Sequence, residues 1–114
     1  MIVVLFEVEP LTGKDARYFD VAASLREELG AIDGFISVER FQSLTRPGAY
    51  LSMSWWRDEE AVRRWRTQAK HRAGQAEGRS SVFANYRIRV AQMLRDYGQH
   101  DRHQAPTDSR EAFP

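Results

Sequence analysis

The order in which two hydrophobic periods follow one another most limits what this chain can fold into. Apolar residues that alternate with polar ones, as in a half-buried strand, occupy residues 2–9, 35–44, 50–56 and 82–94. Apolar residues spaced three and four apart, as in an amphipathic helix, occupy residues 14–29 and 58–76. This order predicts an α+β, ferredoxin-like β-α-β-β-α-β fold with a four-stranded antiparallel sheet.

The second predicted helix has a clear start and two distinct sides. Asp58 is a candidate N-cap, and the acidic residues after it suit the positive end of the helix dipole. Its inward stripe is predicted to hold Val62, Trp65, Ala69, Ala73 and Ala76. Basic residues cover the rest, and the acidic start of the same helix favours a solvated face over a nucleic-acid site: Arg63, Arg64, Arg66, Lys70 and Arg72.

The sheet has one face that these helices cannot cover. Two helices shield one face of a four-stranded sheet, so the other face must meet water or another subunit. That second face still carries apolar residues, such as Val3, Leu5 and either Val38 or Phe41. We therefore predict a homodimer, in which two such faces bury one another.

Size and charge exclude several classes of protein. The chain has 114 residues, which we divide into one domain, 1–97, and a polar C-terminal tail, 98–114. The formal charge of +1 gives no drive toward nucleic acid, and the apolar run 2–6 is too short to span a membrane. The absence of cysteine excludes disulfides and thiolate metal sites. No signal peptide is recognised, so the cytoplasm is the expected location.

Aromatic residues are abundant for one small core. They make up 11% of the chain and include three tryptophans, of which Trp55 and Trp56 are adjacent. Neighbouring residues of a strand point to opposite faces, so one of these two must face the helices and the other the open face. The apolar set Leu51, Met53 and Trp55 predicts that Trp55 faces the helices.

Four short motifs, taken in order, resemble one protein family. They are GFISVERF at 34–41, YLSMSWW at 50–56, DEEA at 58–61, and Trp65 ahead of His71. Their order and spacing are similar to those of the antibiotic biosynthesis monooxygenase (ABM) family over residues 1–95. The resemblance implies a dimeric α+β barrel with a pocket between each protomer's helices and its own sheet. It also implies a monooxygenase that needs no cofactor and oxidises a small aromatic or polyketide-like substrate with dioxygen.

Such chemistry needs an apolar slot, a group that stabilises a phenolate, and exclusion of water. The candidate catalytic residues are His71, Trp65 and Tyr86, and the candidate pocket residues are Phe6, Phe19, Trp55 and Arg87. Arg87 and Arg89 share one strand face, and the favoured interpretation for this pair, instead of anion binding, is ion pairing with Glu7 or Glu39 on neighbouring strands or across the dimer. No metal site is predicted, because the spacing of His100 and His103 in a polar tail is a weak signal.

Two alternatives remain beside the oxygenase. One is a dimer that binds a small molecule without catalysis. The other is haem degradation, whose enzymes within the resembling family place an Asn on the first strand, a Trp on the second helix and a haem-ligating His ten residues later. Trp65 matches, but Phe6 and Gln75 stand at the other two positions. His71 is the one nearby residue that offers a substitute ligand.

Overall fold

The computed structural model describes residues 1–114 apart from the side chains of residues 69 and 70. The predicted sides for Ala69 and Lys70 therefore lie outside the described side chains. The sheet holds β1 (Ile2–Pro10), β2 (Phe35–Gln42), β3 (Tyr50–Trp56) and β4 (Phe83–Gln92). The strand order is β2-β3-β1-β4, and each neighbouring pair is antiparallel.

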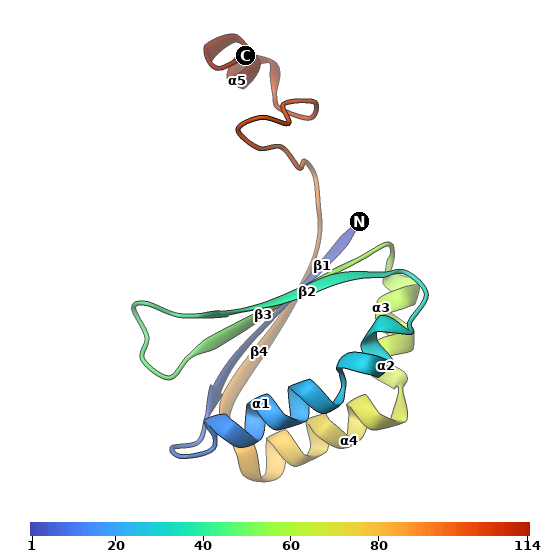
Figure 1. The fold of residues 1–114 in the computed structure, drawn as a ribbon, viewed down its shortest axis with the longest axis vertical. Helices are drawn as coiled ribbons and strands as arrows, with labels where there is room; N and C mark the ends of the chain where they lie inside the picture. The colour runs from blue at the N-terminus through green and yellow to red at the C-terminus, as the bar shows by residue number, and fades with distance from the viewer.

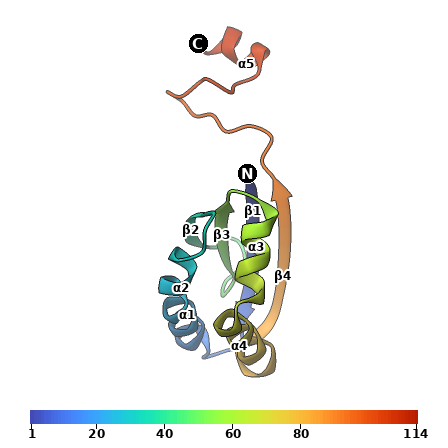
Figure 2. The same cartoon turned by 90° about the vertical axis from the view of Figure 1, so that its right-hand side faces the viewer.

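The helices of the body cover one face of this sheet (Figures 1 and 2). They are α1 (Asp15–Ser24), α2 (Arg26–Gly30), α3 (Glu59–Thr67) and α4 (Ala69–Glu77), with a π-helical turn, η1 (Gly78–Val82), leading into β4. The predicted ferredoxin-like α+β fold is confirmed. No described helix is long and apolar enough to cross a lipid bilayer.

The second predicted helix is divided in two at Gln68. The backbone of Gln68 is extended (φ −66°, ψ 133°), so α3 ends at Thr67 and α4 starts afresh. The Gln68 side chain accepts a hydrogen bond from the backbone N–H of His71 at 2.7 Å and caps α4. Asp58 caps α3 as predicted, accepting from the N–H of Ala61 at 2.9 Å.

This break changes which residues of α4 face the sheet. A continuous helix would turn Ala73 and Ala76 inward, but both are exposed. His71, Gly74 and Gln75 instead border the space between helices and sheet. The predicted stripe is therefore wrong at Ala73 and Ala76, because the extended residue at 68 resets the helical phase.

The strand register corrects the assignment of the adjacent tryptophans. β1 pairs with β3 so that Ile2 lies opposite Trp56 and Phe6 opposite Ser52. Trp56 therefore faces the helices, where it is 1% exposed, and Trp55 lies on the open face with Leu51 and Met53. The prediction for Trp55 is wrong because the open face is as apolar as the covered one, and the covered face of β3 carries serines.

Two apolar clusters hold the helices against the sheet. The first is built on Leu29, Trp56, Ala61 and Val62. The second is built on Val8, Tyr18 and Val82, and Phe6, Tyr50, Phe83 and Tyr86 pack against it. Burying each large side chain of this kind stabilises the fold by about 1.5–3 kcal/mol.

The chain leaves the body after β4. Residues 93–106 and the short helix α5 (Thr107–Ala112) stand away from the sheet and the helices (Figures 1 and 2). The segment is organised around Arg102, whose guanidinium donates to the carbonyls of Gly98, Ser109 and Phe113 and lies 5.5 Å from the Tyr97 ring centre. The division at residue 97 stays a prediction.

Candidate active site in the cavity between helices and sheet

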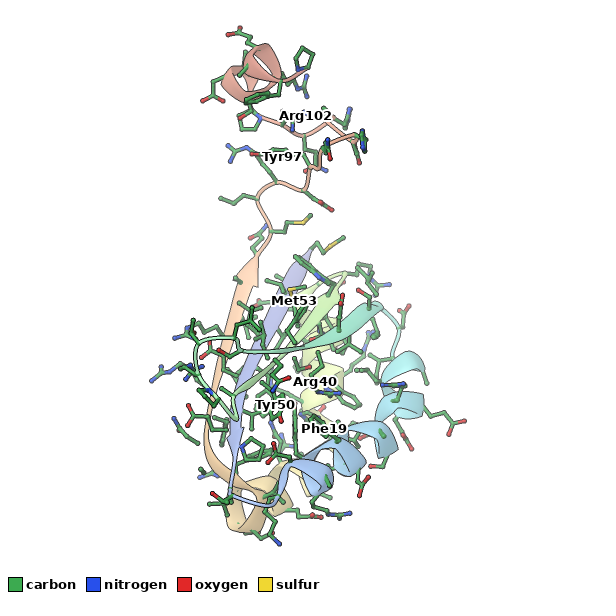
Figure 3. All side chains as sticks on the ribbon, turned by 60° about the vertical axis from the view of Figure 1, so that its left-hand side comes forward. Phe19, Arg40, Tyr50, Met53, Tyr97 and Arg102 are labelled. Carbon is green, nitrogen blue, oxygen red and sulfur yellow. The ribbon has the colours of Figure 1, made fainter. Side chains whose placement is uncertain are left out.

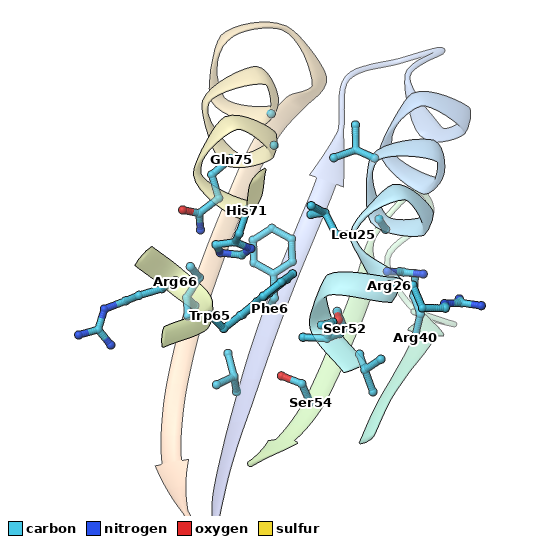
Figure 4. Close-up of a pocket in the computed structure, with 18 of the residues that line it drawn as sticks. Phe6, Leu25, Arg26, Arg40, Ser52, Ser54, Trp65, Arg66, His71 and Gln75 are labelled. Atoms are coloured by element: carbon cyan, nitrogen blue, oxygen red, sulfur yellow. The ribbon is translucent and has the colours of Figure 1, made fainter. Parts of the chain in front are cut away.

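A cavity of about 700 Å³ lies between the helices and the covered face of the sheet (Figure 4). Members of both apolar clusters line it, and its walls are mostly apolar. Phe6 of β1 and Trp65 of α3 lie on its inner side, and Ile88 and Val90 of β4 line it where no helix covers the edge strand. A volume of this size accommodates a small organic molecule.

His71 is the imidazole of this cavity. The Gln68 cap places it in the first turn of α4, and its ring centre lies 4.5 Å from that of Trp65. Burial lowers the pKa of His71 from 6.5 to about 4, and the charge of Arg72 adds to the effect. Its Nδ1 is buried and accepts no hydrogen bond from any residue that the structure describes. His71 is therefore neutral near pH 7, and its Nδ1 is a buried atom without a described hydrogen-bond partner.

Arg40 and Tyr18 form the second polar group of the cavity. Arg40 of β2 donates from Nε to the hydroxyl of Tyr18 of α1 at 3.1 Å, and its guanidinium carbon lies 5.2 Å from the centre of that ring. The centre of the Phe19 ring lies 5.9 Å from the guanidinium carbon of Arg40, and Phe19 also contacts Tyr50 (Figure 3). The half-buried guanidinium is thereby held in one orientation.

The serines of β3 complete the polar lining. Ser52 and Ser54 face the cavity because their register partners Phe6 and Val4 do so. The indole N–H of Trp56 donates to the Ser54 hydroxyl at 2.8 Å. This bond satisfies the buried indole nitrogen and orients the serine at the cavity floor.

The structure brings together three of the seven residues predicted for the site. His71, Trp65 and Phe6 line the cavity. Tyr86 and Phe19 lie beside it: Tyr86 stacks with Phe6 and Phe83, and Phe19 is 37% exposed.

Trp55 and Arg87 are corrected outright, because both point to the open face of the sheet. Arg87 lies opposite Glu7 in the β1–β4 register, but the ion pair with Glu7 is made by the neighbouring Arg89, at 2.8 Å. The predicted ion pairing is therefore confirmed for Arg89, and no ion pair is found for Arg87 among the described residues.

Residues that the sequence reasoning missed are the polar ones on the covered faces of β2 and β3. The sequence prediction turned the apolar set of β3 toward the helices and so left Ser52 and Ser54 on the open face, whereas the register turns both serines, with Arg40 of β2, toward the cavity. On a face that meets the helices, polar residues on two adjacent strands indicate a cavity instead of a packed core.

The haem-degrading pattern is incomplete in space as it is in sequence. Phe6 and Gln75, which stand at the positions of the Asn and the ligating His, both line the cavity. An amide side chain is a poor substitute for imidazole as an iron ligand. The imidazole of His71 is the one histidine ring among the described lining residues. These residues do not fit a haem site of the family type.

The described residues hold no cluster of three or more His, Asp or Glu side chains able to bind a metal ion.

Residues 1–77 match the sequence model of a protein family, the antibiotic biosynthesis monooxygenases. The chain belongs to the antibiotic biosynthesis monooxygenase family. The match covers strands β1 to β3, helices α1 to α4 and the cavity residues Phe6, Trp65 and His71.

Relatives and solved structures agree with this assignment. Over 93 residues the chain is 47% identical to a protein of Pyricularia oryzae named jasmonate monooxygenase ABM, and the match covers 82% of this chain and 43% of that protein. It therefore spans less than half the length of that relative. Over 81 residues it is 28% identical to the uncharacterised protein YqjZ of Bacillus subtilis, covering 71% of this chain and 69% of that one.

The fold is also shared with Rv0793 from Mycobacterium tuberculosis, at a TM-score of 0.75 and 14% identity, over 85% of this chain and 98% of that one. SO0527 from Shewanella oneidensis matches at a TM-score of 0.74 and 15% identity, over 81% of this chain and 89% of that one. At these identities the likeness concerns the fold alone.

Proposed function

We propose that this member of the ABM family is a monooxygenase that oxidises a small organic substrate with dioxygen in the cavity between its helices and its sheet. The observation that carries the proposal is the buried, neutral imidazole of His71, which lines an apolar cavity with an unused nitrogen. The family assignment and the name of the Pyricularia relative support it. Because the chain covers 43% of that relative, its activity and substrate come to this chain only as proposals.

The proposed reaction needs no electrons from outside the substrate. An activated CH₂ group next to a phenol is oxidised to C=O while dioxygen is reduced, with one oxygen atom entering the product and the other leaving as water. The imidazole of His71 accepts a hydrogen bond from the substrate hydroxyl and takes its proton as the phenolate forms. In a cavity that excludes water, the imidazolium and phenolate stabilise one another more than they would in solvent.

Trp65 and Phe6 supply the surface on which the substrate rests. Trp65 also contacts the His71 ring, so it orients the base as well as the substrate. The proposed substrate is an aromatic or polyketide-like compound. Jasmonate is a second candidate on the strength of the relative's name. It has no phenol, so its hydroxylation also consumes two electrons from an added reductant, which the assay below supplies for this compound. Independence from a bound cofactor and assembly as a homodimer are parts of the same proposal.

Oxygen consumption tests the proposal. The purified protein is given a panel of hydroxylated anthrones and naphthols, and jasmonate with an added reductant, in an oxygen electrode. We expect substrate-dependent uptake, with His71→Ala lowering kcat by about 10²-fold or more and Trp65→Phe mainly raising KM. Activity that survives both substitutions unchanged would show that the site has been misplaced.

The same preparation separates the two alternatives. A non-catalytic binding protein would bind members of the panel without consuming oxygen. Haem degradation predicts a shift of the Soret band on titration with haemin, and we expect none, because Gln75 and Phe6 replace the residues of that pattern.

A further inference from the structure

Arg40 is a half-buried cation with unused hydrogen-bonding capacity. Its Nε donates to Tyr18, and the described residues offer no carboxylate within ion-pair distance of its guanidinium. The two terminal nitrogens therefore keep their donors in the parallel geometry that matches a carboxylate. A cation that has lost part of its hydration without gaining a counter-ion is poised to bind an anion.

Arginines elsewhere on the body are mostly neutralised within the chain. Six of them have a carboxylate partner: Arg17, Arg46, Arg57, Arg63, Arg64 and Arg89. Four described arginines line the cavity, and none of these has such a partner: Arg26, Arg40, Arg66 and Arg72. Arg79, Arg87 and Arg95 are also unpaired, but they are exposed and lie outside the cavity. The described arginines that line the cavity thus border an apolar surface without a carboxylate partner.

Arg40 is the member of this group that the structure holds in place. Arg66 extends away from the cavity, and Arg72 donates to the backbone carbonyl of Arg66 at 3.2 Å (Figure 4). Arg26 is exposed and lies on the same side of the cavity as Arg40. The acidic residue in the lining, Glu39, lies in register with Met53 of the open face, so its side chain points away from the cavity.

Tyr18 adds a second donor beside Arg40. Its hydroxyl oxygen accepts from Arg40, which leaves its own proton free to be donated to a ligand. Tyr18 is 5% exposed and packed among aromatic rings, so the hydroxyl does not move far. Arg40 and Tyr18 together make a cation and a neutral donor, side by side, at the edge of an apolar cavity.

We propose that Arg40, positioned by Tyr18, binds the carboxylate of an amphipathic ligand whose apolar body lies against Phe6 and Trp65. The inference rests on the proposed function for the identity of the cavity, and it names the substrate class as a small organic acid. It also makes Arg40 the residue that discriminates an acid from its neutral ester, while His71 lies at the reacting end.

Calorimetric binding of matched acid and ester pairs tests this inference. The probes are 1-naphthylacetate with its methyl ester and jasmonate with its methyl ester. Two different apolar bodies are used so that a preference shared by both pairs reports on the carboxylate. We expect the acid of each pair to bind about tenfold more tightly than its ester.

The variants assign that preference to residues. Arg40→Gln is expected to weaken acid binding by about tenfold or more and to leave ester binding within about twofold. Arg40→Lys, which keeps the charge without the fork, is expected to restore part of the loss. Tyr18→Phe is expected to weaken acid binding severalfold, and the exposed Arg95→Gln serves as a matched control that changes neither.

Ester binding as tight as acid binding, an equal loss for both in Arg40→Gln, or no binding of either probe to the native protein would each overturn the inference. The binding assay is independent of oxygen chemistry. Acid-selective binding without oxygen uptake would leave the carboxylate site standing and reject the oxygenase, and oxygen uptake without acid selectivity would do the reverse.

Discussion

The electrostatics of His71 follow from its neighbours. Trp65 covers one face of the ring, Arg72 adds a positive charge, and no described group offers its Nδ1 a hydrogen bond. Burial disfavours the imidazolium most and the charge of Arg72 adds to the effect, so the pKa falls to about 4. The ring is therefore in its proton-accepting form at neutral pH, but a pKa of about 4 makes it a weak base, so the proposed proton transfer relies on the phenolate charge to raise the pKa of His71 when substrate is bound.

The lowered pKa of His71 has a measurable effect on stability. Between about pH 6.5 and pH 4 the unfolded chain binds a proton at this residue and the folded chain does not, so the free energy of unfolding falls as the pH is lowered. Between pH 6.5 and pH 4 we expect the free energy of unfolding of the native protein to fall by about 1–2 kcal/mol more than that of His71→Gln. This figure allows for the partial exposure of the His71 side chain. Urea denaturation at both pH values measures it, and parallel pH profiles for the two proteins would contradict the burial of this side chain.

At the level of elements, the break at Gln68 determines where the imidazole of His71 lies. We expect Gln68→Ala to destabilise the protein by about 1 kcal/mol, because α4 loses its cap, and to alter the His71 titration followed by NMR. Asp58→Ala is the matched control, because it removes the α3 cap at 2.9 Å and leaves the His71 titration unchanged. Equal effects of both variants on His71 would show that the cap does not position it.

Gly34 connects the helical layer to β2 at a point of close approach. Its φ is +95°, and an added Cβ would lie 2.7 Å from the Cβ of Ala61. We expect Gly34→Ala to cost about 2–4 kcal/mol, combining the strained backbone with a steric clash. Gly13→Ala, at φ +81° with open space around it, is expected to cost about 1 kcal/mol. Chemical denaturation of the pair compares them, and equal costs would show that Ala61 yields without penalty.

Hydrophobic periodicity was enough to predict every strand, the two helical segments between the strands and the antiparallel sheet. It failed where tertiary contacts override local pattern. Gln68 carries no glycine or proline signal, so nothing local marks the break that brings His71 onto Trp65. The covered side of β3 has serines because it lines a cavity, and this reversed the assignment of Trp55 and Trp56.

At the scale of the whole molecule, the open face of the sheet is an apolar surface that the helices do not cover and that a second subunit is expected to bury. Its centre is apolar, because the register places Leu5 of β1 opposite Met53 of β3 and puts Trp55 on the same face, while Glu7 and Arg89 pair at its edge. The tail adds length beyond the body, so that the radius of gyration is 16.6 Å, whereas a compact chain of this length has about 13 Å.

This face predicts a dimer that a single charge can disrupt. Light scattering of the native protein is expected to report twice 13.2 kDa, and Met53→Glu, which places a charge in the centre of the open face, is expected to raise the dissociation constant by about 10²-fold or more. Ala23→Glu, on the exposed side of α1, is the control for an added charge and should leave the mass unchanged. A native mass near 13.2 kDa would contradict the dimer.

Isotope labelling tests the central claim most directly. The protein is dialysed against a chelator, mixed with the best substrate of the panel under ¹⁸O₂, and the product is examined by mass spectrometry. The account predicts one ¹⁸O atom in each product molecule, at a rate that the chelator does not change and that His71→Ala lowers. Product oxygen that comes from water, or turnover lost on chelation and restored by an added metal, would contradict it.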